Sequence, residues 1–302
     1  MQHVTFHVFI DHGLDFTKNG WEGEIGIRWR LPTTKLDDLD FADDIALLSS
    51  TKHHIKEKRA RLDGEARRVG LKINWDKTKM MRINPKQQGP IIINDKEIED
   101  VGEFTYLGTK VCREGGGMKD LRNRLSKARS AYIRLKRIWT LKKIIKRTKI
   151  KLYRTLVIPV LLYGCETWKM NKKDGKMLDV FQQKCLRRIL KIRWEDHVTN
   201  EEVQKRADME QLSCEVKRRR WKIIGDVLRK DRENECNVAL TWTPEGKRKR
   251  GRPKTTWRRT VEKKRGEAGW RTWEEMRSRA KNRERWKSDV RVLCATRHEE
   301  DW

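Results

Sequence analysis

The sequence contains no apolar run long enough to cross a membrane as a helix, which takes at least about 18 consecutive apolar residues. The longest clean run, from Leu156 to Tyr163, is only eight residues long and includes Pro159. The first ten residues mix His and Gln with apolar residues and lack a charged start, so we expect no signal peptide. We therefore expect an intracellular protein that has no membrane partner.

Cysteine pairs with metal-binding spacing are also missing. The six cysteines lie far apart, and none has the Cys-x-x-Cys spacing of a zinc site. Widely scattered cysteines are typical of a reduced intracellular protein with free thiols. His3 and His7 are four residues apart, but no Glu-rich helical context accompanies them, so we do not expect them to hold a metal.

The net positive charge lies in one part of the chain only. Residues 1–116 contain 19 Lys and Arg against 19 Asp and Glu, whereas residues 117–302 contain 54 against 25. The whole excess of +29 therefore lies after residue 116. A basic unit of this size attracts polyanions by counterion release. Because there is no clear lipid anchor and no basic amphipathic helix with a bulky apolar face, the pattern favours nucleic acid over a membrane surface.

Hydrophobic periodicity predicts different structures on the two sides of this boundary. Before it, alternating patterns predict short strands, and a helical pattern over 53–69 ends at Gly70. After the Gly115–Gly117 linker, apolar stripes predict helices, with a kink or break at Pro159. We expect three segments: a small α+β domain, a helical domain and a basic C-terminal region, at 1–116, 117–240 and 241–302.

The segment Leu39–Leu48 contains a pair of acidic residues, Asp43 and Asp44, within Phe-Ala-Asp-Asp. Apolar flanks indicate two short buried strands with the acids at the turn between them. Carboxylates so close together in an interior need a cation, and Mg²⁺ is the natural one because it is held by one or two carboxylates plus substrate phosphates. The alternative is a solvated acidic turn.

The motifs that follow this pair, in order, extend the pattern. They are Gly70-Leu-Lys-Ile-Asn74, Lys77-Thr78-Lys79, Tyr106-Leu-Gly108, Leu162-Tyr-Gly-Cys-Glu-Thr-Trp168 and Gly251-Arg-Pro-Lys-x-x-Trp257. In this order they resemble the C-terminal half of the reverse transcriptase of non-LTR retrotransposons, the endonuclease–reverse transcriptase type. The resemblance implies a fold: a truncated polymerase palm of antiparallel strands with one or two helices, followed by a helical basic thumb and C-terminal region.

The resemblance also implies a mechanism and assigns site residues. It implies an RNA-directed DNA polymerase that joins deoxynucleotides to a DNA primer on an RNA template, using two Mg²⁺ ions. Asp43 would bridge the metals and Asp44 would be its weaker partner. Lys77 would stabilise the pyrophosphate leaving group, with a surface lysine as the alternative. The primer grip would be Tyr106, Leu107 and Gly108, or these residues form a buried strand without function.

The sequence departs from the family upstream of Phe41. Only 40 residues precede it, and Asp11 and Asp15 do not lie in a motif that resembles the family's third metal-binding Asp. We therefore expect an incomplete two-metal site with little or no activity in this chain alone. A truncated or decayed element copy and a gene model without its 5′ part fit equally well.

The segment Lys247–Lys254 contains Arg-Gly-Arg-Pro, the core of an AT-hook that binds the minor groove of A·T duplex DNA. Its expected nucleic-acid contacts are Arg248, Arg250, Gly251, Arg252 and Lys254. The segment also resembles a nuclear localisation signal, so the nucleus or a cytoplasmic ribonucleoprotein is the expected location. The alternative to a polymerase fragment is a non-catalytic basic protein that binds nucleic acid. We expect most of the ten tryptophans after residue 117 to lie in the core.

Overall fold

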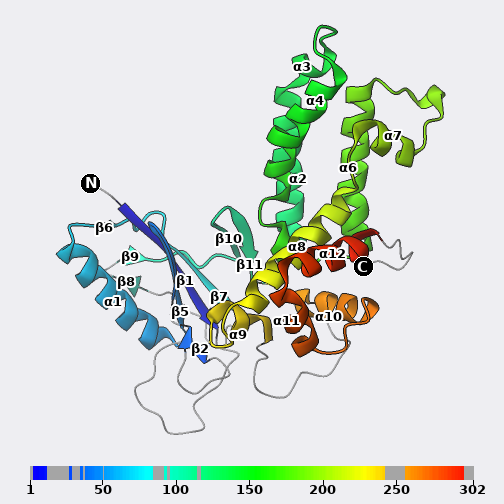
Figure 1. The fold of residues 1–302 in the computed structure, drawn as a ribbon. Coiled ribbons are helices and arrows are strands. Elements are labelled where there is room, and N and C mark those ends of the chain that lie inside the picture. The colour runs from blue at the N-terminus through cyan, green and yellow to red at the C-terminus, as the bar shows by residue number, and fades with distance from the viewer. Residues whose placement is uncertain are drawn as a thin grey trace. The chain divides into compact units, whose positions relative to one another are not determined.

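The computed structural model describes nine stretches of the chain, namely residues 3–11, 27–28, 35–36, 38–49, 51–83, 92–93, 96–113, 117–241 and 256–295. These residues are mostly helical, with a few short antiparallel strand pairs near the N-terminus (Figure 1). The chain forms two compact units, one of residues 1–116 with 241–251 and one of residues 117–240 with 252–302.

The first unit is built on a five-stranded sheet. Its strands follow the order β4-β5-β1-β6, and β7 also pairs with β1. Their bounds are β1 (His3–Asp11), β4 (Asp38–Phe41), β5 (Asp44–Ser49), β6 (Lys72–Ile73) and β7 (Lys79–Ile83). The β4–β5 pair is antiparallel, as expected for a palm, but β1 runs parallel to β5, β6 and β7. The predicted antiparallel pairing is therefore present at β4–β5, whereas β1, a strand that the sequence patterns did not predict, adds parallel pairs and is joined to its neighbours by long connections.

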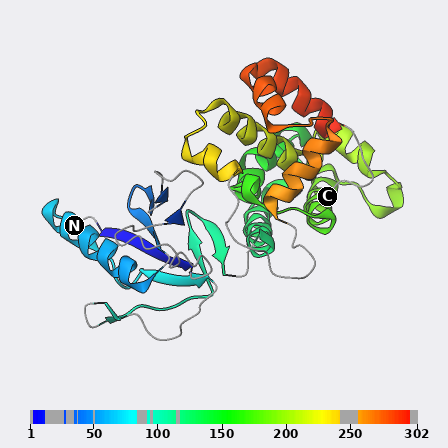
Figure 2. The same ribbon diagram turned by 90° about the horizontal axis from the view of Figure 1, so that it is seen from below.

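Helix α1 (Lys52–Arg68) covers one face of this sheet (Figure 2). The Ile55 side chain of α1 packs with Leu47 of β5 and Met80 of β7 in a small core. The Thr51 hydroxyl accepts the backbone N–H of His54 at the N-terminus of the helix, and Gly70 follows its C-terminus with φ +75°. The predicted helix and its glycine stop are confirmed within a residue or two.

Three two-stranded hairpins complete the strands that the structure describes. They are β2 (Ile27–Arg28) with β3 (Lys35–Leu36), β8 (Ile92–Ile93) with β9 (Lys96–Glu97), and β10 (Glu103–Tyr106) with β11 (Thr109–Cys112). The predicted hairpin around residues 91–98 corresponds to β8–β9. The predicted strand over 104–108 is instead one arm of a hairpin whose turn contains Leu107 and Gly108.

The second unit is helical. Its α-helices are α2 (Gly117–Arg134), α3 (Lys136–Thr140), α4 (Lys146–Leu152), α5 (Ile158–Leu162), α6 (Lys172–Leu190), α7 (Asn200–Ala207), α8 (Leu212–Arg229), α9 (Glu235–Thr241), α10 (Trp257–Glu267), α11 (Trp273–Lys281) and α12 (Arg283–Ala295). The break predicted near Pro159 takes the form of a π-helical turn, Tyr153–Val157, directly before α5. Such a turn widens the helix just ahead of a residue that has no backbone N–H.

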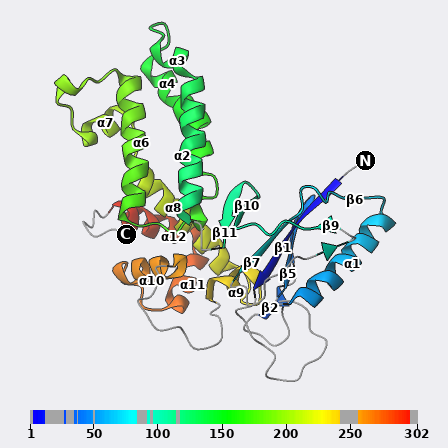
Figure 3. The same ribbon diagram turned by 180° about the vertical axis from the view of Figure 1, so that it is seen from behind.

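Two hydrophobic cores hold this unit together. The larger one joins α2 through α8, and α2 and α6 lie side by side within it (Figures 1 and 3). The second one joins α8 to α10, α11 and α12, so the helices of the basic C-terminal region share a core with the preceding helical segment. In the part of the chain that the structure describes, no helix is long and apolar enough to span a membrane.

Candidate functional site

The acidic pair lies at the tip of the β4–β5 hairpin. Phe41 is directly opposite Asp44, which leaves Ala42 and Asp43 as a two-residue turn. Ala42 has φ +53° and Asp43 has no positive φ, the pattern of a type II′ turn. Because this turn normally places glycine at its first position, Ala42 holds a strained conformation. The prediction that both acids sit at a tight turn is confirmed.

The register of the hairpin decides which face each acid occupies. Residues directly opposite each other in an antiparallel pair have side chains on one face. Asp40 is opposite Ile45, which packs on the same core as α1, whereas Asp44 is opposite Phe41 on the other face. Asp43 is exposed and Asp44 is half-buried. Asp44 therefore lies on the face of the sheet opposite α1, next to a solvent-accessible turn carboxylate.

The two strands of the hairpin differ in burial. Residues Ala46 to Ser49 of β5 are buried, as the apolar flank predicts. All four residues of β4 are exposed, including Phe41 at 63%, so the prediction of a second buried strand is wrong. The cause is position: β4 is the edge strand of the sheet among the residues described. Burial, and then the neighbouring Asp38, raises the pKa of Asp40.

A second hairpin tip approaches the first. Leu107 and Gly108 form the turn between β10 and β11 with φ +47° and +76°, the two positive values of a type I′ turn. The Tyr106 hydroxyl donates a hydrogen bond of 2.9 Å to the carbonyl oxygen of Leu39 in β4. Burial, followed by the charges of Asp40 and Asp44, raises the pKa of Tyr106. The structure thus brings Tyr106, predicted in the primer grip, to the acidic hairpin.

Lys77 lies in the turn between β6 and β7. Its backbone N–H donates to Asn74 Oδ1 at 3.1 Å, and its side chain is exposed. The neighbouring Lys79 instead forms an ion pair with Glu99. The Lys77 side chain is therefore accessible to solvent. Its role at the leaving group stays a prediction.

A third carboxylate is not brought to the acidic pair by β1. Thr5 of β1 is aligned with Asp44, and Asp11 lies six residues further along the same strand. At about 3.3 Å per residue, the Asp11 backbone is about 20 Å beyond that point. Among the described residues there is no group of three His, Cys, Asp or Glu side chains that could hold a metal ion. Two carboxylates match what Mg²⁺ takes from a protein when phosphates supply other ligands.

The Leu162–Trp168 motif forms a polar junction inside the second unit. The Trp168 indole donates to the buried Asp120 carboxylate at 2.7 Å, and the Arg220 guanidinium donates to the Trp168 carbonyl at 2.5 Å. Burial lowers the pKa of Arg220 to about 10. Cys165 is fully buried, and burial followed by the charge of Glu166 raises its pKa to about 12. This motif acts as packing between α2 and α8.

The start of the C-terminal region reaches the same junction. The indole N–H of Trp257, the first residue of α10, donates to the Glu166 carbonyl at 2.7 Å. Two motifs that the sequence separates by 91 residues are therefore in contact. All of the residues predicted to bind nucleic acid lie outside the described residues: Arg248, Arg250, Gly251, Arg252 and Lys254.

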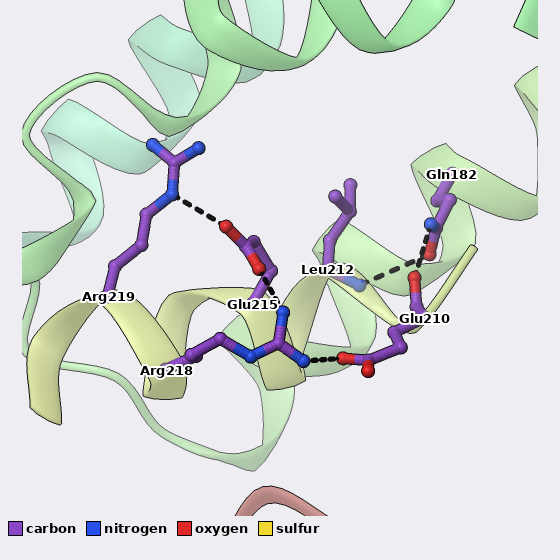
Figure 4. A network of polar contacts seen from close by, with 6 residues as sticks. All are labelled: Gln182, Glu210, Leu212, Glu215, Arg218 and Arg219. Carbon is purple, nitrogen blue, oxygen red and sulfur yellow. Dashed lines mark hydrogen bonds and ion pairs between the residues drawn. The ribbon is translucent and has the colours of Figure 1, made fainter. Parts of the chain in front are cut away.

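Helix α8 carries a network of charges that are paired within the unit (Figure 4). Arg218 pairs with Glu210 and, at 2.6 Å, with Glu215, which also accepts from Arg219 at 2.9 Å. The buried Gln182 of α6 donates to the Glu210 carbonyl at 2.7 Å and accepts the Leu212 N–H at 3.2 Å. Gln182 thus ties the α7–α8 connection to α6, and Arg218 ties the Glu210 side chain of that connection to α8.

Comparison with known proteins supports an origin in a transposable element. The chain is 25% identical over 244 residues to a transposon-derived protein of Caenorhabditis elegans, and the match covers 78% of this chain and 87% of that protein. No protein-family model matches the chain, and no solved structure matches it. The chain is thus distantly homologous to a transposon-derived protein.

Proposed function

We propose that this chain is the palm-and-thumb part of an RNA-directed DNA polymerase from a non-LTR retrotransposon. The observation that carries the proposal is the arrangement at the β4–β5 tip. Asp43 lies in a two-residue turn, Asp44 is the strand residue that follows it, and a second hairpin is hydrogen-bonded to the same hairpin through Tyr106. The distant homology to a transposon-derived protein supports the same origin.

In this proposal Asp43 and Asp44 hold Mg²⁺ together with the phosphates of a bound deoxynucleotide. When bound, the metal stabilises charge on the attacking and leaving oxygens of the transferred nucleotide. The hairpin supplies rigidity: Leu47 and Leu48 of β5 are buried, so Asp44 lies at the end of a packed strand. The Leu107–Gly108 turn would place its backbone against the primer, and Tyr106 would fix that turn relative to the carboxylates.

The described residues supply only two of the carboxylates of a two-metal site, so we expect weak catalysis. Each 1.4 kcal/mol of lost transition-state stabilisation slows a reaction tenfold, and one missing charged ligand costs several kcal/mol, about a thousandfold or more in rate. Primer extension on an RNA template measures this directly. We expect the unchanged chain to make little more product than the Asp43→Asn variant. Asp38→Asn is the control, because it removes the same charge from the opposite face of the hairpin.

Robust synthesis that depends on Asp43 but not on Asp38 would establish a complete polymerase and overturn the incomplete site. Equal and robust synthesis by all three proteins would overturn the role of the hairpin. The same samples report binding to the RNA–DNA hybrid by a gel shift, which does not require catalysis. Failure to bind the hybrid at any salt concentration contradicts the polymerase origin of the site.

A second candidate function is non-catalytic binding of nucleic acid, which the charge distribution favours. The segment after residue 116 carries the full net charge of +29. Counterion release then predicts affinity that falls steeply with salt, whether or not Asp43 and Asp44 bind metal. Salt-sensitive binding of nucleic acid without any metal ion held by Asp43 and Asp44 in the presence of a deoxynucleotide assigns the chain to this class, because an incomplete polymerase also gives little extension.

A further inference from the structure

One stretch of the helical unit has no acidic residue at all. Residues 121–165 contain 14 Lys and Arg and no Asp or Glu, and residues 180–194 of α6 and its following loop also lack acids. The first stretch comprises most of α2 and all of α3, α4 and α5. Because no carboxylate lies within these segments, their cations do not form the local ion pairs that are common on α8.

The structure brings the ends of these two stretches together. Helices α2 and α6 form a pair, and α3 and α4 pack against α6 at the end of this pair that is furthest from α8 (Figures 1 and 3). There the buried Lys149 donates to the carbonyl oxygens of Trp139 at 2.9 Å and Leu141 at 2.6 Å, which fixes the α3–α4 connection. Lys191, just after α6, lies close enough to lower the pKa of Lys149 further, after the effect of burial.

This end presents exposed cations on both sides of the contact. Lys142, Lys143, Lys146 and Arg147 are exposed on the α3–α4 connection and the start of α4. Lys191 and Arg193 are exposed after α6. We call these six residues, together with Trp194, the basic tip.

Trp194 is the exception among the tryptophans of this unit. Eight of the ten tryptophans after residue 117 lie in the described stretches, and five of them are buried and two half-buried. Trp194 alone among these eight is exposed, at 82%. It follows Lys191 by three residues, so it lies within about 10 Å of that residue along the chain. Exposing an entire indole has a hydrophobic cost that core packing does not explain.

The turn that carries Trp194 is held in place. The Asp196 carboxylate accepts the Arg193 N–H at 2.7 Å, and the His197 N–H donates to the Trp194 carbonyl at 3.3 Å. Arg187 of α6 donates to the Val198 carbonyl at 2.8 Å and ties the following chain back to the helix. The indole is therefore presented on a structured turn.

We propose that the basic tip binds single-stranded nucleic acid, with a base stacked on Trp194 and backbone phosphates at Lys142, Lys143 and Lys146. The inference rests on the proposed function only for the class of partner, nucleic acid. An exposed aromatic ring beside a track of cations is how proteins hold single strands, because every base has a stacking face and every nucleotide has a phosphate. A paired base is already stacked within its duplex, so an unpaired base suits the indole better.

A membrane surface is the rival partner for Trp and Lys side chains. A helix that lies in a membrane needs a continuous bulky apolar face. Helix α4, by contrast, has exposed Lys146, Arg147 and Lys151 within its seven residues, and its apolar Ile150 is buried. Charge complementarity along the acid-free helices therefore favours a polyphosphate chain.

The test uses the full chain and a fluorescently labelled oligouridylate of about 16 nucleotides, the upper end of the site size of single-strand-binding folds. Trp194→Ala should raise Kd about tenfold, and Trp194→Phe should keep most of the affinity, because stacking survives on a phenyl ring. The triple variant Lys142→Gln, Lys143→Gln, Lys146→Gln should make the slope of log K against log salt shallower by about 2, since each single-strand phosphate contact contributes about 0.7.

Two controls separate stacking from charge. Inorganic polyphosphate has no bases, so Trp194→Ala should bind it as the unchanged chain does, whereas the triple variant should bind it more weakly. A matched triple variant of exposed lysines outside the basic tip, Lys169→Gln, Lys173→Gln and Lys222→Gln, should leave the effect of Trp194→Ala on Kd unchanged.

Two results would overturn the inference. One is an unchanged Kd for oligouridylate in Trp194→Ala. The other is a Trp194-dependent affinity for phosphatidylserine vesicles or for duplex that exceeds the affinity for the single strand. Neither result bears on the acidic hairpin, and a negative primer-extension result leaves this binding test unaffected.

Discussion

The indole N–H of Trp257 donates a 2.7 Å hydrogen bond to the carbonyl oxygen of Glu166. This bond joins the first turn of α10 to the short 3-10 turn Cys165–Thr167 between α5 and α6. Beside it, Arg220 of α8 reaches both the Trp168 carbonyl and the Thr260 hydroxyl. The Leu162–Trp168 motif and the start of α10 at Trp257 are thus two sides of one packing junction.

Replacing Trp257 by Phe should destabilise the second unit. The substitution removes the donor and leaves the Glu166 carbonyl without it, which costs about 1 kcal/mol in the free energy of unfolding. Trp273→Phe is the control, because Trp273 is also half-buried and its ring contact with Arg265 survives on a phenyl ring. Urea unfolding of the full chain measures both. Equal losses in the two variants contradict a specific role for the Trp257 bond.

Gly225 in α8 should not tolerate alanine. A Cβ there would meet the indole of Trp286, at 2.7 Å from Cδ1 and 2.8 Å from Cε2, where that ring stacks on Trp270. Gly225→Ala should therefore lower Tm, although alanine usually stabilises a helix interior by about 1 kcal/mol over glycine. Gly266→Ala in α10, with no atom within 4 Å of the added Cβ, should raise Tm instead. A rise in both variants would show that Trp286 is not seated against Gly225.

Ala42→Gly should stabilise the acidic hairpin. Ala42 has φ +53°, where a non-glycine residue loses about 1 kcal/mol or more. Glycine at this position removes the steric cost and should raise the free energy of unfolding of the first unit by about that amount. Ala66→Gly, in the regular part of α1, should lower it. If Ala42→Gly also lowers the free energy of unfolding, the assignment of a type II′ turn is wrong.

Asp179 should make the second unit less stable as pH rises from acidic to neutral. Its carboxylate accepts the Ser213 N–H at the start of α8 at 3.0 Å, and burial raises its pKa above the usual 3.8 despite that bond. When the pKa of a carboxyl group is higher in the folded chain than in the unfolded chain, the protonated group stabilises the folded state. This stabilisation is complete at a pH below the unfolded-state pKa and is lost as the pH rises through the folded-state pKa. Asp179→Asn keeps an acceptor for Ser213 without the charge.

The stability of Asp179→Asn relative to the unchanged chain should therefore increase as pH rises from about 3 toward neutrality. Chemical unfolding at a series of pH values gives this difference directly. A difference that stays constant over the range shows that the carboxyl group has the same pKa in the folded and unfolded chain.

Local patterns in the sequence predicted the elements that depend on local physics. The helix ending before Gly70 and the buried half of the hairpin, Ala46–Leu48, follow from apolar spacing and from a glycine suited to positive φ. The tight turn at Asp43 follows from two acids between apolar runs. The core position of most tryptophans was likewise predictable from helical spacing.

Features that depend on contacts between distant residues were not predictable from one sequence. The exposure of Phe41 follows from β4 being an edge strand, which no pattern within β4 reveals. The Tyr106–Leu39 bond joins residues 67 apart in the chain. Trp194 carries a weak local signal, since it lies between two helices among charged residues. Its exposure is nevertheless a result of the folded packing around α6.

We propose that Asp43 and Asp44 form a metal-binding pair that has no third carboxylate beside it among the described residues. Titration with Mn²⁺, followed by electron paramagnetic resonance in the presence of a deoxynucleotide, tests it most directly. We predict one weak bound ion that is lost in Asp43→Asn and in Asp44→Asn and is kept in Asp38→Asn. Mn²⁺ binding that is the same in all four proteins, or a tight pair of ions in the unchanged chain, would contradict the account.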